Sequence, residues 1–207
     1  MRNGDKGNNI SKEVKAMVEG KGTGTGNTYE LDMKDFVRSF IGVVKTVILK
    51  PKEFYQNMPT TGGFPSPLIF LVVCLGISAL ISAIIWGTVA GFFYFLIFGL
   101  VVSFIGAAIL YFIAQQFFEG KGTYEGTYRV VAYAGVVSLI SWLSVIPVLG
   151  GIIAFLAFLY GFYLQFVGVE KVHKITQGQA IVTVLIAFAV SIILGLLMPG
   201  GLFLGMR

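Results

Sequence analysis

Residues 54–118 read FYQNMPTTGGFPSPLIFLVVCLGISALISAIIWGTVAGFFYFLIFGLVVSFIGAAILYFIAQQFF and contain no Asp, Glu, Lys or Arg. A water-facing surface needs charged side chains, whereas hydrocarbon makes them costly. The stretch is far longer than the about 20 apolar residues that one helix needs to cross a bilayer. It therefore predicts a transmembrane helical hairpin.

Two more charge-free stretches follow, at residues 130–169 and 175–206, and the charges between them form short clusters. Of the 207 residues, 56% are hydrophobic and only 12% are charged. The mean hydropathy is +0.85. These values are typical of a membrane protein and not of a soluble domain with a buried core.

Glycine and proline residues divide the apolar stretches into five predicted spans. Gly87 and Gly91 interrupt the first stretch, and Pro147 with Gly150 and Gly151 interrupts the second. The predicted spans cover residues 67–87, 92–112, 130–146, 151–169 and 180–198. The expected fold is an all-α integral membrane bundle of five transmembrane helices, preceded by an interfacial amphipathic helix.

The chain is expected to have four regions. They are a flexible, glycine-rich cytoplasmic tail at 1–31, an amphipathic helix with a Pro/Gly loop at 32–66, the five-span domain at 67–198 and a short tail at 199–207. The tail contains GKGTGTG at 20–26, but a phosphate-binding loop needs its lysine after the glycines and a strand before them. A linker is therefore the favoured interpretation of this glycine run.

A basic amphipathic helix is predicted from Asp32, as N-cap, to Leu49. Its broad apolar face contains Met33, Phe36, Val37, Phe40, Val43, Val44, Val47 and Ile48. Such a helix just before a span is typical of the lipid headgroup layer. The residues expected at the membrane interface are Phe36, Arg38, Phe40, Lys45, Phe54 and Tyr55. The alternative is that this helix packs on a soluble partner or on loops of its own chain.

The distribution of basic residues predicts the orientation of the chain in the membrane. Ten of the fifteen precede the first predicted span, two lie between spans two and three, and two lie between spans four and five. Only Arg207 lies on the other side. Lysine and arginine mark cytoplasmic loops, so the N-terminus is expected in the cytoplasm and the C-terminus outside. The net charge of +5 is thereby explained by topology, and no nucleic-acid partner is expected.

The sequence gives no indication of catalysis. Cys74 and His173 are the only residues of their types, and no second ligand stands at metal-binding spacing. The predicted spans contain no ionisable acid or base, which disfavours proton-coupled pumps and voltage sensors. We therefore expect no catalytic, cofactor-binding or metal site, and lipid, possible cytoplasmic proteins and a second copy of the chain as partners.

Two functions from different classes remain open. The first is a non-enzymatic scaffold that organises or shapes the membrane through the amphipathic helix. The second is a small permease or channel for a neutral or lipidic solute, with a path lined by Ser138, Ser141, Tyr160 and Gln165. Hydroxyl groups in membrane helices bond to the backbone or to neighbouring helices more often than they line a solute path, which favours the scaffold.

The order of proline, glycine and aromatic residues resembles the Yip family of small five-span membrane proteins. The resemblance rests chiefly on Pro51, Pro59, Gly63, Pro67, Gly122, Tyr124, Tyr133, Pro147 and Gly150. It is extended by Phe54, Tyr55, Met58, Phe70, Thr127, Arg129, Tyr160, Gly168, His173, Thr176 and Ala180. It covers about residues 36–198.

The resemblance implies a role in membrane organisation or trafficking, with partners on the cytoplasmic face. It also implies that residues 122–124 and Tyr133 begin the third span and that Pro147 turns the central hairpin. Eukaryotic members interact with Ypt/Rab proteins, but this N-terminal tail lacks the acidic, tyrosine-containing segment of those members. The chain is more similar to prokaryotic members, which places it in a prokaryotic cell membrane.

Overall fold

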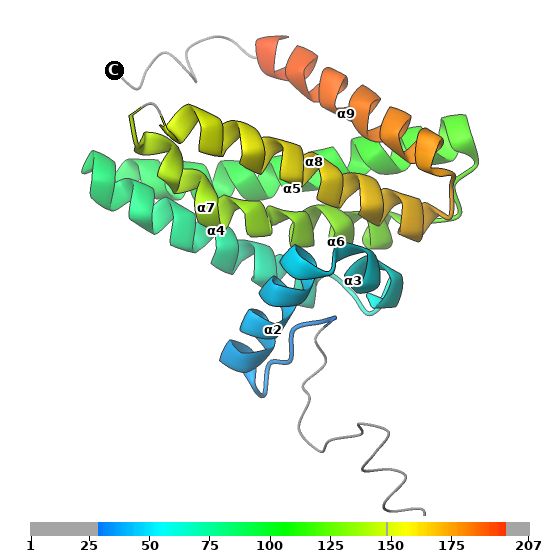
Figure 1. Ribbon diagram of the computed structural model, residues 1–207, viewed down its shortest axis with the longest axis horizontal. Coiled ribbons are helices and arrows are strands. Elements are labelled where there is room, and N and C mark those ends of the chain that lie inside the picture. The colour runs from blue at the N-terminus through cyan, green and yellow to red at the C-terminus, as the bar shows by residue number, and fades with distance from the viewer. Residues whose placement is uncertain (1–28, 148, 198–207) are drawn as a thin grey trace, which may run out of the picture.

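The computed structural model describes residues 29–147 and 149–197, and these residues form helices joined by short loops. Figure 1 shows the long helices side by side along the longest axis, with the short N-terminal helices against one flank. Most of the expected N-terminal tail, residues 1–28, and the expected C-terminal tail at 199–207 lie outside the described residues. The all-α class is confirmed for this part of the chain.

Helices α4 (Pro65–Trp86) and α5 (Val89–Phe118) form the predicted hairpin. Pro65 stands in the first turn of α4, where a missing amide proton costs little. Gly87 ends α4 with φ +66°, a left-handed conformation that glycine adopts without strain. The Thr88 hydroxyl then accepts a hydrogen bond from the Gly91 amide at 3.2 Å and caps α5. Gly87 is therefore a turn residue, whereas Gly91 stands in the first turn of α5.

The predicted third span, 130–146, is not one continuous helix. α6 (Tyr124–Ala134) begins six residues earlier and is followed by the 3₁₀ helix η1 (Gly135–Val137), α7 (Ser138–Ser141) and the 3₁₀ helix η2 (Trp142–Val145). The Thr123 hydroxyl caps α6 by accepting from the Gly126 amide at 3.1 Å, which explains the earlier start. Apolar composition alone could not reveal this start or the 3₁₀ segments.

Two more helices complete the bundle: α8 (Leu149–His173) and α9 (Gln177–Leu197). The Gly150 amide donates to Ile146 at 2.7 Å across the turn that contains Pro147. Thr176 and Gln179 form a capping box, in which each side chain bonds the backbone amide of the other residue. This pair fixes the start of α9.

Three helices in the described residues are long and apolar enough to cross a membrane: 65–85, 89–118 and 149–173. Residues 177–193 of α9 form a shorter apolar helix. These lengths support a multi-pass membrane protein. The third predicted segment alternates between α and 3₁₀ geometry, and the count of five spans stays a prediction.

The amphipathic region forms α2 (Phe36–Leu49) and α3 (Pro51–Asn57). Asp32 is not the N-cap: its carboxylate accepts from the Lys34 amide at 2.8 Å in a local turn, and the helix begins four residues later. Residues 29–31, expected in the flexible tail, are instead packed, because Leu31 is buried and its amide donates to Ser66 at 3.2 Å.

Close contacts hold α6 against its neighbours. A β-carbon added to Gly168 of α8 would lie 2.3 Å from a methyl group of Val130. Such a distance is impossible without movement, and the β-branched Val130 side chain is stiff. Gly168 thus permits α6 and α8 to approach at this level of the bundle.

We expect Gly168→Ala to lower the free energy of unfolding by about 1–3 kcal/mol, because it overpacks this contact. Gly178→Ala is the matched control, since a β-carbon there has no neighbouring atom within 4 Å. Chemical denaturation in detergent micelles measures both. A Gly168→Ala protein as stable as the Gly178→Ala protein would contradict the assigned packing.

Candidate functional site

Charged residues gather at one end of the bundle, here called the polar end. Within the described residues they fall in three segments: 30–53, 119–129 and 170–174. α4 begins at this end, α5 ends there, α6 begins there and α8 ends there. The candidate site is therefore built from loops and helix ends on a single side of the apolar helices.

Arg129 is the central charged residue of the polar end and is 0% exposed. Its Nη1 donates to Glu30 at 2.8 Å, and its Nη2 donates to the Gly63 carbonyl at 2.9 Å. Its Nε lies 3.5 Å from Glu125, close enough for an ion pair without a hydrogen bond. The two carboxylates retain partial exposure, with side chains 26% and 24% accessible. A buried guanidinium is tolerated only with such partners.

The loop before α4 is shaped to meet this arginine. Gly62 and Gly63 have φ values of +120° and +87°, which other residues rarely adopt. The Gly63 amide donates to Glu125 at 2.7 Å while its carbonyl accepts from Arg129. One peptide segment thus bonds both members of the α6 ion pair, which holds the loop in place.

His173 performs a similar packing role at the end of α8. The Thr127 hydroxyl donates to the Thr123 carbonyl at 2.9 Å, so its oxygen accepts from Nε2 of His173 at 2.8 Å. A β-carbon at Gly120 or Gly122 would lie within 2.8 Å of the imidazole Nδ1. The glycines therefore leave room for a buried ring that fixes the α5–α6 loop.

An aromatic cluster lies beside the ionic one. Phe54 packs edge-on against Tyr133 with ring centroids 5.0 Å apart, and Tyr133 lies 5.0 Å from Phe70. Phe40 of α2 reaches Phe70 at 5.3 Å. The cluster connects α2, α3, α4 and α6, so the short helices are fixed to the bundle by aromatic burial.

The expected interfacial position of Phe54 and Tyr55 is wrong. Both side chains are buried within the protein, at 0% and 2% exposure. Tyr55 donates to the Val130 carbonyl at 3.4 Å, and burial raises the pKa of its hydroxyl. An aromatic pair before a span is typical of the interfacial belt, but here Val130 and Tyr133 of α6 contact the pair, and α3 packs mainly on α8.

The predicted apolar face of α2 is divided into two stripes. The inner stripe packs on the bundle, and it consists of Phe36, Phe40, Val43 and Val47, of which the two valines are fully buried. The outer stripe consists of Val37, Ile41 and Ile48, which are 68%, 46% and 40% exposed, while Val44 is half-buried and packs on the core. At 100° per residue, the outer stripe lies directly beside Arg38 and Lys45, and Lys34 stands in the turn just before the helix.

The other residues that carry the family resemblance have structural roles in several parts of the protein. Pro51 opens α3, and Pro67 is buried in the first turn of α4. Tyr124 donates to the Phe104 carbonyl at 3.2 Å and ties α6 to α5. Pro59 lies in the loop between α3 and α4, while Pro147 and Gly150 form the distant turn before α8.

The sequence did not indicate the ion pair between Glu30 and Arg129. Glu125 and Arg129 stand four residues apart, a spacing that suggests a helical pair. Glu30, in contrast, belongs to the region interpreted as a tail, and its partner is 99 residues away. The one available signal was the charge cluster at 119–129 before an apolar stretch.

A cavity of about 510 Å³ lies deeper among the helices, bounded by α5, α6, η1, α8 and α9. Of the four residues proposed for a solute path, Gln165 lines it. Tyr160 instead donates to the Ile48 carbonyl at 2.6 Å, and the Ser138 carbonyl accepts from the Ser78 hydroxyl. The side chain of Ser141 lies outside the described atoms.

A family model for the Yip1 domain matches residues 45–198, from within α2 to the end of α9. The match covers more than half of the chain and contains Arg129, His173 and, of the aromatic cluster, Phe54, Phe70 and Tyr133. The chain belongs to the Yip family. No curated protein and no solved structure gave a match.

In this Yip-family protein, the motif residues converge mainly on the polar end and not on a cleft with paired acids or nucleophiles. Within residues 29–147 and 149–197, no three His, Cys, Asp or Glu side chains lie close enough to hold a metal ion. What the site offers chemically is a rigid, charged platform attached to apolar helices.

We expect Arg129→Gln to lower the free energy of unfolding by about 3 kcal/mol, since it leaves two carboxylates and the Gly63 carbonyl without their cation. Lys50→Gln is the control, because the Lys50–Glu53 pair is exposed and contributes no more than about 1 kcal/mol. Denaturation in micelles measures both. Equal losses would show that Arg129 does not hold the platform together.

Proposed function

We propose that this Yip-family protein is a non-enzymatic membrane-organising scaffold whose α2 helix lies in the headgroup layer of the cytoplasmic leaflet. The observation that carries the proposal is the outer stripe of α2, apolar and exposed, with Arg38 and Lys45 along its edge and Lys34 in the turn before the helix. No residue of the chain is assigned a catalytic role in this proposal.

The outer surface of α2 has an apolar part that suits the acyl boundary of a membrane and a basic part that suits its headgroup layer. Exposed Val37, Ile41 and Ile48 are unfavourable in water but favourable at the acyl boundary. Lys34, Arg38 and Lys45 would meet anionic headgroups, each at a gain of about 1 kcal/mol. The same helix therefore combines shallow apolar insertion with lipid-charge attraction.

The inner stripe gives this helix a fixed position. The ring contact of Phe40 with Phe70 and the burial of Val43 and Val47 hold α2 against the bundle. A wedge that is inserted into one leaflet and attached to transmembrane helices adds area to that leaflet alone. This asymmetry supports a role in bending the bilayer or in recruiting cytoplasmic partners, which include a second copy of the chain.

We further propose five spans, with the segment from α6 to η2 as the third. This segment runs from the polar end to the Pro147 turn, where α8 begins, so it extends between the same two ends as its neighbours. Together with the basic residues counted above, this supports a cytoplasmic N-terminus and an external C-terminus. The proposed location is a prokaryotic cell membrane.

The double substitution Val37→Asp with Ile41→Asp is expected to abolish tubulation or deformation of vesicles that contain anionic lipid, because it places two charges in the inserted stripe. Phe36 and Phe40 are unsuitable targets, since both pack on the protein. Electron microscopy of proteoliposomes at matched protein content measures the effect.

Lys52→Asp with Gln56→Asp is the matched control, because both residues are exposed on the neighbouring α3. This control should deform vesicles as the parent protein does. Deformation that persists in the α2 variant, at equal reconstitution, would overturn the proposed role of α2.

Single cysteines on a Cys74→Ser background test the topology. Cysteines at Lys121 and Gln177 should react with an impermeant maleimide only from the cytoplasmic side. Cysteines at Val89 and Gly205 should react only from the outside. Labelling of Gly205 from the cytoplasm would contradict five spans, whatever the behaviour of α2.

A further inference from the structure

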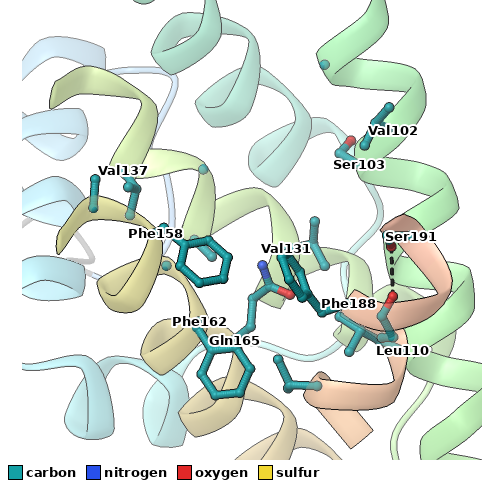
Figure 2. A pocket seen from close by; sticks show the side chains of 18 of the residues that line it. Val102, Ser103, Leu110, Val131, Val137, Phe158, Phe162, Gln165, Phe188 and Ser191 are labelled. Atoms are coloured by element: carbon teal, nitrogen blue, oxygen red, sulfur yellow. Dashed lines mark hydrogen bonds between the residues drawn. The ribbon is translucent and has the colours of Figure 1, made fainter. Parts of the chain in front are cut away.

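The cavity among the long helices has a lining that is almost wholly apolar. α5 and α8 face each other across it, α9 packs against both, and η1 contributes the wall on the α6 side. Figure 2 shows Phe158 and Phe162 of α8 and Phe188 of α9 around the opening. Gly99, Gly106 and Gly161 widen it, because they have no side chains. A volume of about 510 Å³ is within the range of small-molecule sites.

Few polar side chains line this cavity, and they differ in whether they form hydrogen bonds within the protein. Ser103 donates to the Leu100 carbonyl at 2.7 Å, and Ser191 donates to Ala187 at 2.8 Å. Both hydroxyl protons are therefore used within their own helices. Gln165, whose side chain lies in the middle of the lining in Figure 2, has no hydrogen-bond partner among the described residues.

This combination restricts what occupies the cavity. Buried water forms two to four hydrogen bonds, and the lining side chains offer it few partners, namely Gln165 and the accepting hydroxyl oxygens of Ser103 and Ser191. An unbonded carboxamide in apolar surroundings is costly, so Gln165 favours an occupant that exchanges a hydrogen bond with it. No Asp, Glu, Lys, Arg or His is among the lining residues, so a charged headgroup would find no counter-ion there.

We propose that the cavity binds one uncharged, single-chain lipid, with its acyl or isoprenyl chain between α5, α8 and α9. Its hydroxyl, ester or amide group forms the missing hydrogen bond with Gln165. The lipid fills the space between α5 and α8, which make few direct contacts with each other, and it lies beside α9. This site is separate from α2 and does not depend on the scaffold function.

The test uses photolabelling of the full chain in nanodiscs. The probe is a monoacylglycerol with a diazirine in its acyl chain, and unlabelled monooleoylglycerol is the competitor. Peptide mass spectrometry is expected to place saturable labels on the cavity-facing segments of α5, α8 and α9. Excess competitor should remove these labels and leave diffuse labelling of the lipid-facing surface unchanged.

Gly106→Leu should abolish the saturable labelling, because a β-carbon at Gly106 has no neighbouring atom within 4 Å and the larger side chain would occupy the cavity. Gly76→Leu is the matched control: it is also a helical glycine with open space around it, but it does not line the cavity. Labelling in the control should equal that of the parent protein.

Gln165→Leu tests the polar contact. It should weaken competition by monooleoylglycerol about fivefold, which is the effect of one hydrogen bond. Competition by a long-chain alkane should not weaken. The proposal is overturned if labels are not saturable, if Gly106→Leu and Gly76→Leu label alike, or if a fatty acid competes better than the monoacylglycerol.

Discussion

The guanidinium group of Arg129 connects three segments that are distant in the chain: the residues before α2, the glycine loop before α4 and the start of α6. A buried cation is unfavourable by itself, so its presence requires Glu30, Glu125 and the Gly63 carbonyl to stay in place. The position of α3, and through it of α2, depends on the same loop. The polar end is therefore one connected structure, although each of its contacts is made by a short segment.

This connection determines how α2 functions in the proposed scaffold. An isolated amphipathic helix binds a membrane by its single apolar face and can leave it again. In this protein one apolar stripe is used against the bundle, which leaves Val37, Ile41 and Ile48 for lipid. The helix is thus attached at a fixed place beside α4, and insertion requires no separate binding event. The motif residues of the Yip family contribute mainly to this attachment.

The sequence predicted the long helices well, because hydrophobic length and the glycine at position 87 act locally. It predicted less well wherever contacts between distant residues decide the structure. Phe54 and Tyr55 have the composition of an interfacial pair, yet both are buried, in contact with Val130 and Tyr133 of α6, and α3 packs on α8. Asp32 has the features of an N-cap, but it forms a local turn instead. Two features form only when several helices come together: the pairing of Glu30 with Arg129 and the cavity around Gln165. No local sequence pattern could predict them.

The length of α5 has a consequence for where the protein is most stable. Its 30 residues extend about 45 Å, whereas the hydrocarbon core of a bilayer is about 30 Å thick. Phe112 and Phe117, near its end, remain 58% and 65% exposed, so part of the excess length is apolar. The exposed Gln115 and Gln116 stand between these two rings, so the apolar part of α5 ends near Ala114, still longer than the hydrocarbon core. Such a helix must tilt, or the bilayer around it must thicken, at a cost that grows with the mismatch. The stability of the protein is therefore expected to depend on membrane thickness.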